Sequence, residues 1–248
     1  MSEIKIHILH TGRVCVSPYL PYGGEHCNII KASGILGKKS DRLWLPVSCY
    51  LIEHPKGKVL VDTGWHRDMS PNGVFDKKAQ IKSLGSPILY LVNQGVLEKG
   101  AAINEQLKEM GIKPADLDYV IVTHLDCDHA NGLEQVADAG NLMVAADEVK
   151  CAEKNSAVRY KKKWWAKVPF TEYQWNGNDG PAEKSYDLFG DGGYSAKSWK
   201  EMITSGISLD KKMSRKSLEW IRKQSLNKDC VESLANHDID VVPHVILL

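Results

Sequence analysis

The chain has almost no excess charge, with 32 Lys and Arg residues against 31 Asp and Glu residues and a net charge of +1. Acids and bases are interspersed, so we expect neither a basic face for nucleic acid nor a polybasic anchor for a membrane. The lysine triplet at residues 161–163, followed by two tryptophans, is interpreted as a solvated face. The sequence also lacks a long apolar run and internal repeats, which argues against membrane-spanning and solenoid proteins. We therefore expect a small-molecule partner, no nucleic acid and no membrane.

A pairing pattern of cysteines is also missing. The six cysteines are widely scattered without a Cys-x-x-Cys motif, and the residues after Met1 lack the pattern of a signal peptide. These absences favour reduced thiols and predict a cytoplasmic protein.

The length of 248 residues suits one α/β domain, and we predict a single domain over residues 1–248. Alternating isoleucines at positions 4, 6 and 8 predict a first strand, with a second strand near residues 14–16. A hairpin is expected at residues 49–61 and an amphipathic helix at residues 101–110. Residues 65–94 collect glycine and proline without periodicity, which predicts an irregular excursion over the mouth of an active site.

Later elements follow the same reasoning. The patterns predict a helix at residues 133–139, a strand at 142–145, a helix at 148–153, a helix after Ser214 and a final strand at 241–248.

The densest chemical signal is Thr123-His124-Leu125-Asp126-Cys127-Asp128-His129, which directly follows an apolar run. Imidazole and carboxylate form the ligand mixture that zinc, iron or manganese accepts. A solvated helix cap is the plainer interpretation, but a cap needs one such residue and not four. The segment therefore predicts a metal site, with Cys127 interpreted as a bystander.

This motif resembles the His-x-His-x-Asp-His signature of the metallo-β-lactamase superfamily, with Asp126 in place of the second histidine. Asp62-Thr63-Gly64 resembles the end of the family's early hairpin, and Asn236-His237-Asp238 resembles its last metal-binding loop. Within this superfamily, the sequence resembles the N-acyl-homoserine lactonase branch in particular. It implies an αβ/βα four-layer sandwich.

The resemblance implies a cofactor of two divalent metal ions, with zinc expected first and iron or manganese as alternatives. A Gly-Asp-x-x-Tyr turn of the family matches residues 190–194, which assigns the bridging carboxylate to Asp191 and a phenol facing the substrate to Tyr194. Asp62 is expected to support the metal loops through hydrogen bonds. The implied metal ligands are His124, Asp126, Asp128, His129, Asp191 and His237.

The implied activity is hydrolysis of N-acyl-homoserine lactones or similar esters by a metal-bridging hydroxide. Asp128 and Tyr194 are the expected catalytic residues, the latter stabilising the oxyanion. A small-molecule ester is the expected partner, and a homodimer is a further expectation.

The sequence departs from the family at two places. Asp126 is a hard oxygen ligand, which shifts the metal preference toward iron or manganese. Between Gly190 and Tyr194 the family carries strands and a loop with the third histidine of the first metal, and roughly 30 residues are missing here. Strands of the second sheet are therefore expected to be absent. Asp191 is either the bridging aspartate or the acid of the upstream turn, and the residues from Tyr194 to Trp199 favour the bridging role.

These departures keep other functions open. The chain could be a catalytically impaired or non-catalytic remnant of the fold. It could also hydrolyse thioesters or phosphodiesters, or resemble the flavodiiron oxidoreductases, which carry an acid at the position of Asp126.

Overall fold

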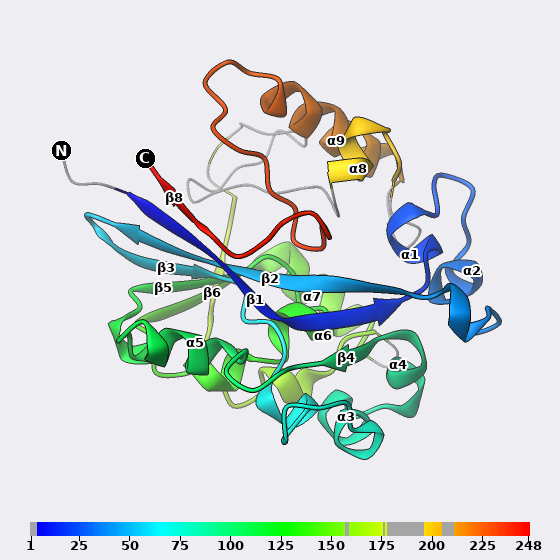
Figure 1. Ribbon diagram of the computed structural model, residues 1–248, viewed down its shortest axis with the longest axis horizontal. Helices are drawn as coiled ribbons and strands as arrows, with labels where there is room; N and C mark the ends of the chain where they lie inside the picture. The colour runs from blue at the N-terminus through cyan, green and yellow to red at the C-terminus, as the bar shows by residue number, and fades with distance from the viewer. Residues whose placement is uncertain (1–3, 157–158, 176, 178–195, 205–210) are drawn as a thin grey trace. The chain divides into compact units, whose positions relative to one another are not determined.

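The computed structural model describes residues 4–156, 159–175, 177, 196–204 and 211–248. The chain forms two compact units (Figure 1). Unit 1 comprises Met1–Val14, Pro46–Gln174 and Val242–Leu248, and unit 2 comprises Cys15–Leu45 and Trp175–Val241. The single domain over residues 1–248 stays a prediction.

A mixed sheet organises unit 1. Its strands run in the order β4-β1-β2-β3-β5-β6-β7, and β8 pairs with β1. β2 and β3 form the antiparallel hairpin that was predicted, and β3, β5, β6 and β7 are parallel neighbours. The strands are β1 (Lys5–Val16), β2 (Leu43–His54), β3 (Gly57–Val61), β4 (Gln94–Val96), β5 (Tyr119–Val122), β6 (Asn141–Ala145), β7 (Thr171–Tyr173) and β8 (Val245–Leu247).

The register between β3 and β5 positions the motif. Val61 pairs with Ile121 in this parallel ladder, and the N–H of Asp62 donates to the carbonyl of Ile121 at 2.8 Å. Val59 and Leu60 of β3 are buried, as are the last three residues of β5, so the paired ends of both strands lie in the core. Because parallel strands end at the same edge of a sheet, the residues that follow β3 and β5 lie beside each other.

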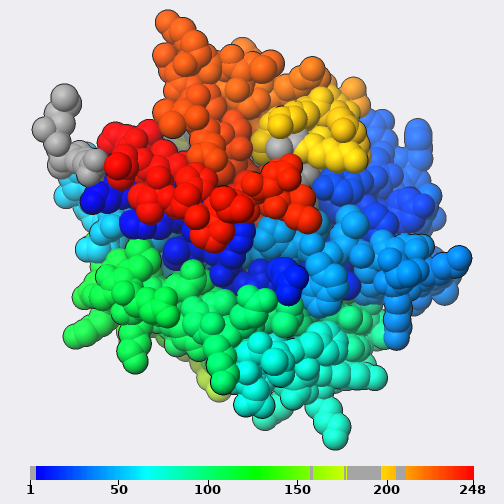
Figure 2. All heavy atoms as spheres, in the orientation of Figure 1, coloured from blue at the N-terminus to red at the C-terminus, as the bar shows by residue number. Residues whose placement is uncertain are grey.

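Helices of unit 1 follow the strands, and α3, α4 and α5 lie on one side of the sheet (Figure 1). In Figure 2 this part of the chain, cyan to green, forms the lower surface of unit 1. The α-helices are α3 (Lys77–Leu84), α4 (Pro87–Val92), α5 (Ile103–Glu109), α6 (Cys127–Ala130) and α7 (Ala146–Lys154). Short 3-10 turns are η2 (Arg67–Met69), η3 (Pro114–Asp116), η4 (Leu133–Val136) and η5 (Lys162–Trp164).

The prediction of an irregular segment at residues 65–94 was wrong. Asp76 caps α3 by accepting the N–H groups of Lys78 and Ala79, and Gly85 ends it in a left-handed conformation. Ser86 then caps α4. Gly85 and Pro87, two of the residues that suggested a loop, are helix stop and start signals, because they suit helix ends rather than interiors.

The other predicted elements agree with the structure in most places. The helix at 101–110, the strand at 142–145, the helix at 148–153 and the helix after Ser214 are confirmed. The predicted pair of strands at the start is one continuous strand, β1. The predicted helix at 133–139 is only the 3-10 turn η4, and the last strand is limited to Val245–Leu247.

Unit 2 is mainly helical in its described part. Trp199, Leu218 and Ala235 form a buried apolar cluster between α8, α9 and the segment that follows them. The N–H of Gly24 donates to the carbonyl of Thr204 at 3.0 Å, which joins the two segments of this unit. Its helices are α1 (Tyr19–Tyr22), α2 (Ile29–Ser33), η1 (Lys39–Asp41), α8 (Ala196–Lys200) and α9 (Lys211–Ser225).

No helix in the described parts of either unit is long and apolar enough to cross a membrane.

Candidate metal centre

The motif lies at the carboxyl end of β5. Thr123 follows the strand, and Asp126 is the N-cap residue of the short helix α6, with extended backbone angles of φ −68° and ψ 159°. The carbonyl of Asp126 accepts the N–H groups of His129 at 3.1 Å and Ala130 at 2.9 Å. A strand, a sharp turn and one helical turn therefore bring the alternating polar residues of the motif to one edge of the sheet.

The motif residues of unit 1 gather closely. The ring centroids of His124 and His129 are 3.8 Å apart. Nε2 of His124 lies 3.6 Å from Oδ2 of Asp126, and Nε2 of His129 lies 3.9 Å from Oδ2 of Asp128. Each distance joins a nitrogen and a carboxylate oxygen that one ion could span, since zinc binds such atoms at about 2.0–2.2 Å.

Asp62 fixes the orientation of the motif, as predicted. Its Oδ1 accepts the N–H of Thr123 and its Oδ2 accepts the hydroxyl of Thr123, both at 2.8 Å. Its Oδ2 also lies 2.7 Å from Nδ1 of His129. A proton on Nδ1 leaves Nε2 of this imidazole as the nitrogen that can bind a metal.

The charges of this cluster are strongly coupled in the metal-free protein. Burial would lower the pKa of His129, but the carboxylates of Asp62 and Asp128 raise it to about 9. Burial and the neighbouring His129 lower the pKa of His124 to about 4. Burial opposes the ionisation of Asp62, but His129 holds the pKa of that carboxyl below its usual value.

Arg159 binds Asp126 through two hydrogen bonds. Its Nε donates to Oδ1 of Asp126 at 2.6 Å, and its Nη2 donates to Oδ2 at 2.5 Å. The Arg159 side chain is 30% exposed and that of Asp126 is 15% exposed. Burial opposes the charge of Asp126, but the Arg159 guanidinium holds the pKa of the carboxyl below its usual value. The carboxylate that replaces a histidine of the family signature thus has a guanidinium as its partner.

Residues of α7 and the segment after it surround this pair. Oε1 of Glu148 accepts the N–H of Leu125 at 2.8 Å, which ties α7 to the motif. Arg159 lies 5.0 Å from the ring centroid of Tyr160, whose side chain is buried. Burial raises the pKa of Tyr160, and the Asp126 carboxylate raises it further. The pair is therefore enclosed by protein groups on this side.

Cys127 behaves as the predicted bystander. Its buried thiol donates a weak hydrogen bond to Oδ1 of Asp128 at 3.9 Å. Burial raises its pKa well above the usual value, and the neighbouring carboxylates of Asp128 and Asp126 raise it further.

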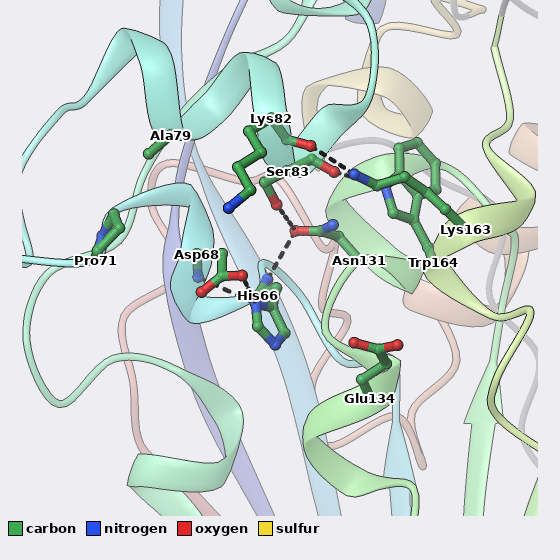
Figure 3. Close-up of a pocket in the computed structure, with 10 residues that line it drawn as sticks. All are labelled: His66, Asp68, Pro71, Ala79, Lys82, Ser83, Asn131, Glu134, Lys163 and Trp164. Atoms are coloured by element: carbon green, nitrogen blue, oxygen red, sulfur yellow. Dashed lines mark hydrogen bonds and ion pairs between the residues drawn. The ribbon is translucent and has the colours of Figure 1, made fainter.

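Behind the motif lies a cavity of about 300 Å³ (Figure 3). Oδ1 of Asn131 accepts the N–H of His66 at 2.9 Å and the hydroxyl of Ser83 at 3.3 Å. Lys82 and Lys163 face Asp68 and Glu134 across its lining, so charges of both signs are present. Asn131 thereby joins the motif, the loop after β3 and α3.

The predicted site residues come from both units and from a part of the chain outside the described residues. His124, Asp126, Asp128 and His129 belong to unit 1, whereas His237 belongs to unit 2. Asp191 and Tyr194 lie outside the described residues. The sequence analysis missed Arg159 and Glu148, and it named Thr123 only as the first residue of the motif. The signal for Arg159 was Asp126 itself, because a buried carboxylate in place of an imidazole requires a counter-charge.

The two halves of the motif fit a metal ion differently. Asp128 offers a carboxylate and His129 an imidazole whose Nδ1 is held by Asp62, and these donors fit a divalent ion. Asp126 offers a carboxylate with both oxygens already bonded to Arg159, which does not fit a second ion. The donor set thus supports one of the two implied metal positions.

Comparison with known proteins gives a family match. The family model described as "Metallo-beta-lactamase superfamily" matches residues 42–193. The N-acyl homoserine lactonase AttM of Rhizobium johnstonii is 24% identical over 201 residues, which are 77% of this chain and 65% of the relative. N-acyl homoserine lactonase AiiB of Agrobacterium fabrum is 34% identical over 117 residues, or 47% of this chain and 37% of the relative. The chain thus spans less than two thirds of the length of these relatives.

Solved structures show the same fold. An N-acyl homoserine lactone hydrolase, with the product N-hexanoyl-L-homoserine at its catalytic metal center, superposes with a TM-score of 0.69 at 20% identity. The match covers 96% of this chain and 95% of that one. AidC, a dizinc quorum-quenching lactonase, matches with a TM-score of 0.50 at 13% identity over 90% of this chain and 84% of its own. The predicted mixed α/β fold class is therefore confirmed.

Proposed function

Because this chain belongs to the metallo-beta-lactamase superfamily, we propose that it is a metal-dependent hydrolase that opens N-acyl homoserine lactones or similar esters. The relatives named as N-acyl homoserine lactonases support the substrate class. The observation that carries the proposal is the bond between Asp62 and His129, which prepares Nε2 of His129 for a metal. A solvated cap would not need a buried carboxylate behind its histidine.

The cofactor in this proposal is a divalent ion held by Asp128, His129, His237 and Asp191. Zinc is the first expectation, supported by the dizinc lactonase of the same fold, and iron or manganese are the alternatives. Such an ion, when bound, lowers the pKa of a water ligand and polarises an ester carbonyl.

The residues of the chain would orient the reaction. Asp62 keeps a proton on Nδ1 of His129, so that this imidazole presents Nε2 throughout the cycle. Thr123 holds Asp62 in place through two hydrogen bonds to its carboxylate. Tyr194, from the sequence motif, would donate its hydroxyl to the developing oxyanion of the substrate. Asp128 has both a binding and a catalytic role in this proposal.

The first test measures hydrolysis of N-hexanoyl-homoserine lactone by protein reloaded with zinc, iron or manganese. Proton release reports the reaction, and mass spectrometry detects the hydrolysed product. We expect turnover that a chelator abolishes and that Asp128→Asn reduces at least 100-fold. Asp138→Asn, at an exposed aspartate, is the matched control and should retain activity. Turnover of a thioester or phosphodiester without any turnover of lactones would contradict the proposed substrate.

The cellular location belongs to the same proposal. All six cysteines are free thiols, three of them buried, which supports a reducing compartment such as the cytoplasm. The homodimer stays a prediction. Light scattering during size-exclusion chromatography would measure the molar mass that tests it.

A further inference from the structure

Asp126 differs from an ordinary N-cap residue. An aspartate at this position usually accepts an N–H of the first helical turn, yet the side chain of Asp126 makes no such bond to α6. Both of its oxygens instead accept hydrogen bonds from Arg159, 33 residues later in the chain. The carboxylate is thus held by a tertiary contact and not by its own helix.

The geometry of this pair bears on metal binding. Oδ2 of Asp126 is the oxygen that faces Nε2 of His124 at 3.6 Å, and the same oxygen accepts Nη2 of Arg159 at 2.5 Å. A two-point guanidinium bond occupies one lone pair on each carboxylate oxygen, which leaves fewer for a metal. An ion bound between His124 and Asp126 would also lie next to a fixed positive charge, and like charges repel strongly where water is excluded.

We propose that Arg159 takes the place of the first metal ion, so that each chain binds one divalent ion, at Asp128 and His129, and none at His124 and Asp126. The inference rests on the proposed function, because this one ion is the cofactor of the hydrolysis. The guanidinium places a positive charge against both oxygens of the Asp126 carboxylate. Unlike a metal ion, the guanidinium cannot bind a water or a substrate oxygen as a ligand. Arg159 therefore acts as a positioning residue.

The surroundings of Arg159 support a permanent role. Glu148 is held by the N–H of Leu125, and the Arg159 guanidinium lies over the ring of Tyr160. The two bonds to Asp126 and the contact with the Tyr160 ring hold the guanidinium in place.

The test is the metal stoichiometry of the whole chain. Chelator-stripped protein is reloaded with zinc, freed of excess ion and measured by elemental analysis, and a cobalt titration is followed by its visible absorption. We expect one ion per chain by both methods. Two ions per chain would overturn the inference and leave the proposed function standing.

Variants decide which residues hold the ion. His129→Gln is expected to reduce the stoichiometry from one to none, whereas Asp126→Asn is expected to leave it at one. Since Asp126→Asn leaves Arg159 with a weaker partner and could unfold, the double variant Asp126→Asn with Arg159→Met removes both charges and serves as the second test. Loss of the ion from a folded double variant would overturn the inference.

Arg13→Met, at an exposed arginine of unit 1, is the control and should keep one ion. The outcomes also separate this inference from the proposed function. One ion without lactone hydrolysis supports the inference and contradicts the function. No ion at all in folded wild-type protein overturns both.

Discussion

Oδ2 of Asp62 lies 2.7 Å from Nδ1 of His129, a contact that joins the end of β3 to the only turn of α6. Both side chains are almost fully buried, with 1% and 3% of their surfaces exposed. The carboxylate was expected to support the metal loops, and the structure shows how it does so. It selects the imidazole nitrogen that remains for a metal.

Replacing Asp62 by asparagine should weaken metal binding. The amide carries no charge and holds the His129 imidazole less firmly, so we expect metal affinity to fall about 10–100-fold. Competition with a chromophoric chelator measures this change. The control is Asp118→Asn, at an exposed carboxylate that accepts the backbone N–H of Lys58. Equal losses in both variants would contradict the role of Asp62.

The stability of the metal-free protein should depend on pH through its two motif histidines. The pKa of His129 is raised to about 9, so its contribution is complete below about pH 6.5 and is lost as the pH rises to about 9. The pKa of His124 is lowered to about 4, so stability is also lost as the pH falls from about 6.5 toward 4.

We therefore expect the free energy of unfolding to be highest near neutral or slightly acidic pH, with an alkaline loss on the order of 3 kcal/mol. Urea unfolding at a series of pH values measures the profile. His129→Gln should flatten its alkaline side, and an unchanged slope in that variant would assign the loss to other groups.

Arg67 should contribute more to stability than an exposed arginine does. It pairs with Glu105 and donates to the carbonyls of Ser70, Leu97 and Glu98. A lysine cannot reach all of these acceptors, so Arg67→Lys is expected to cost about 1–3 kcal/mol.

The matched control is Arg13→Lys. Arg13 is 53% exposed and pairs only weakly with Glu98, so its replacement should cost about 0–0.5 kcal/mol. Urea unfolding compares the two variants, and similar losses would show that the several acceptors of Arg67 add nothing to stability.

Gly64, the last residue of the Asp-Thr-Gly motif, should tolerate no side chain. Its φ is +63°, and an added Cβ would lie 1.8 Å from Oγ1 of Thr11. We expect Gly64→Ala to cost about 3 kcal/mol or more, because backbone strain and a buried clash add.

Gly111→Ala separates these two causes. Gly111 has a similar φ of +74° but nothing within 4 Å of an added Cβ, so only about 1 kcal/mol is expected. Thermal unfolding of both variants measures the difference. A milder effect at Gly64 than at Gly111 would contradict the close approach of Thr11.

Local sequence patterns predicted most of the elements around the site. The apolar run before Thr123 became β5, and the helical spacing of residues 101–110 became α5. The segment at 65–94 was misjudged because capping residues and loop residues have the same composition, and only Asp76 and Ser86 in their caps distinguish them. Sequence periods of 2 or 3.6 residues reveal which residues of a strand or helix are buried. Short capped helices contain too few turns to show such a period clearly.

By itself, the sequence determined the chemistry of the centre and its place after a strand, because ligand type and spacing are local properties of the motif from His124 to His129. Only the tertiary structure decided which partners these side chains have. Any of the 32 Lys and Arg residues could have neutralised Asp126, and the fold selected Arg159. Asp62 reaches His129 because β3 and β5 end at the same edge of a parallel sheet. Contacts between residues distant in the chain depend on strand order and register, which no local pattern contains.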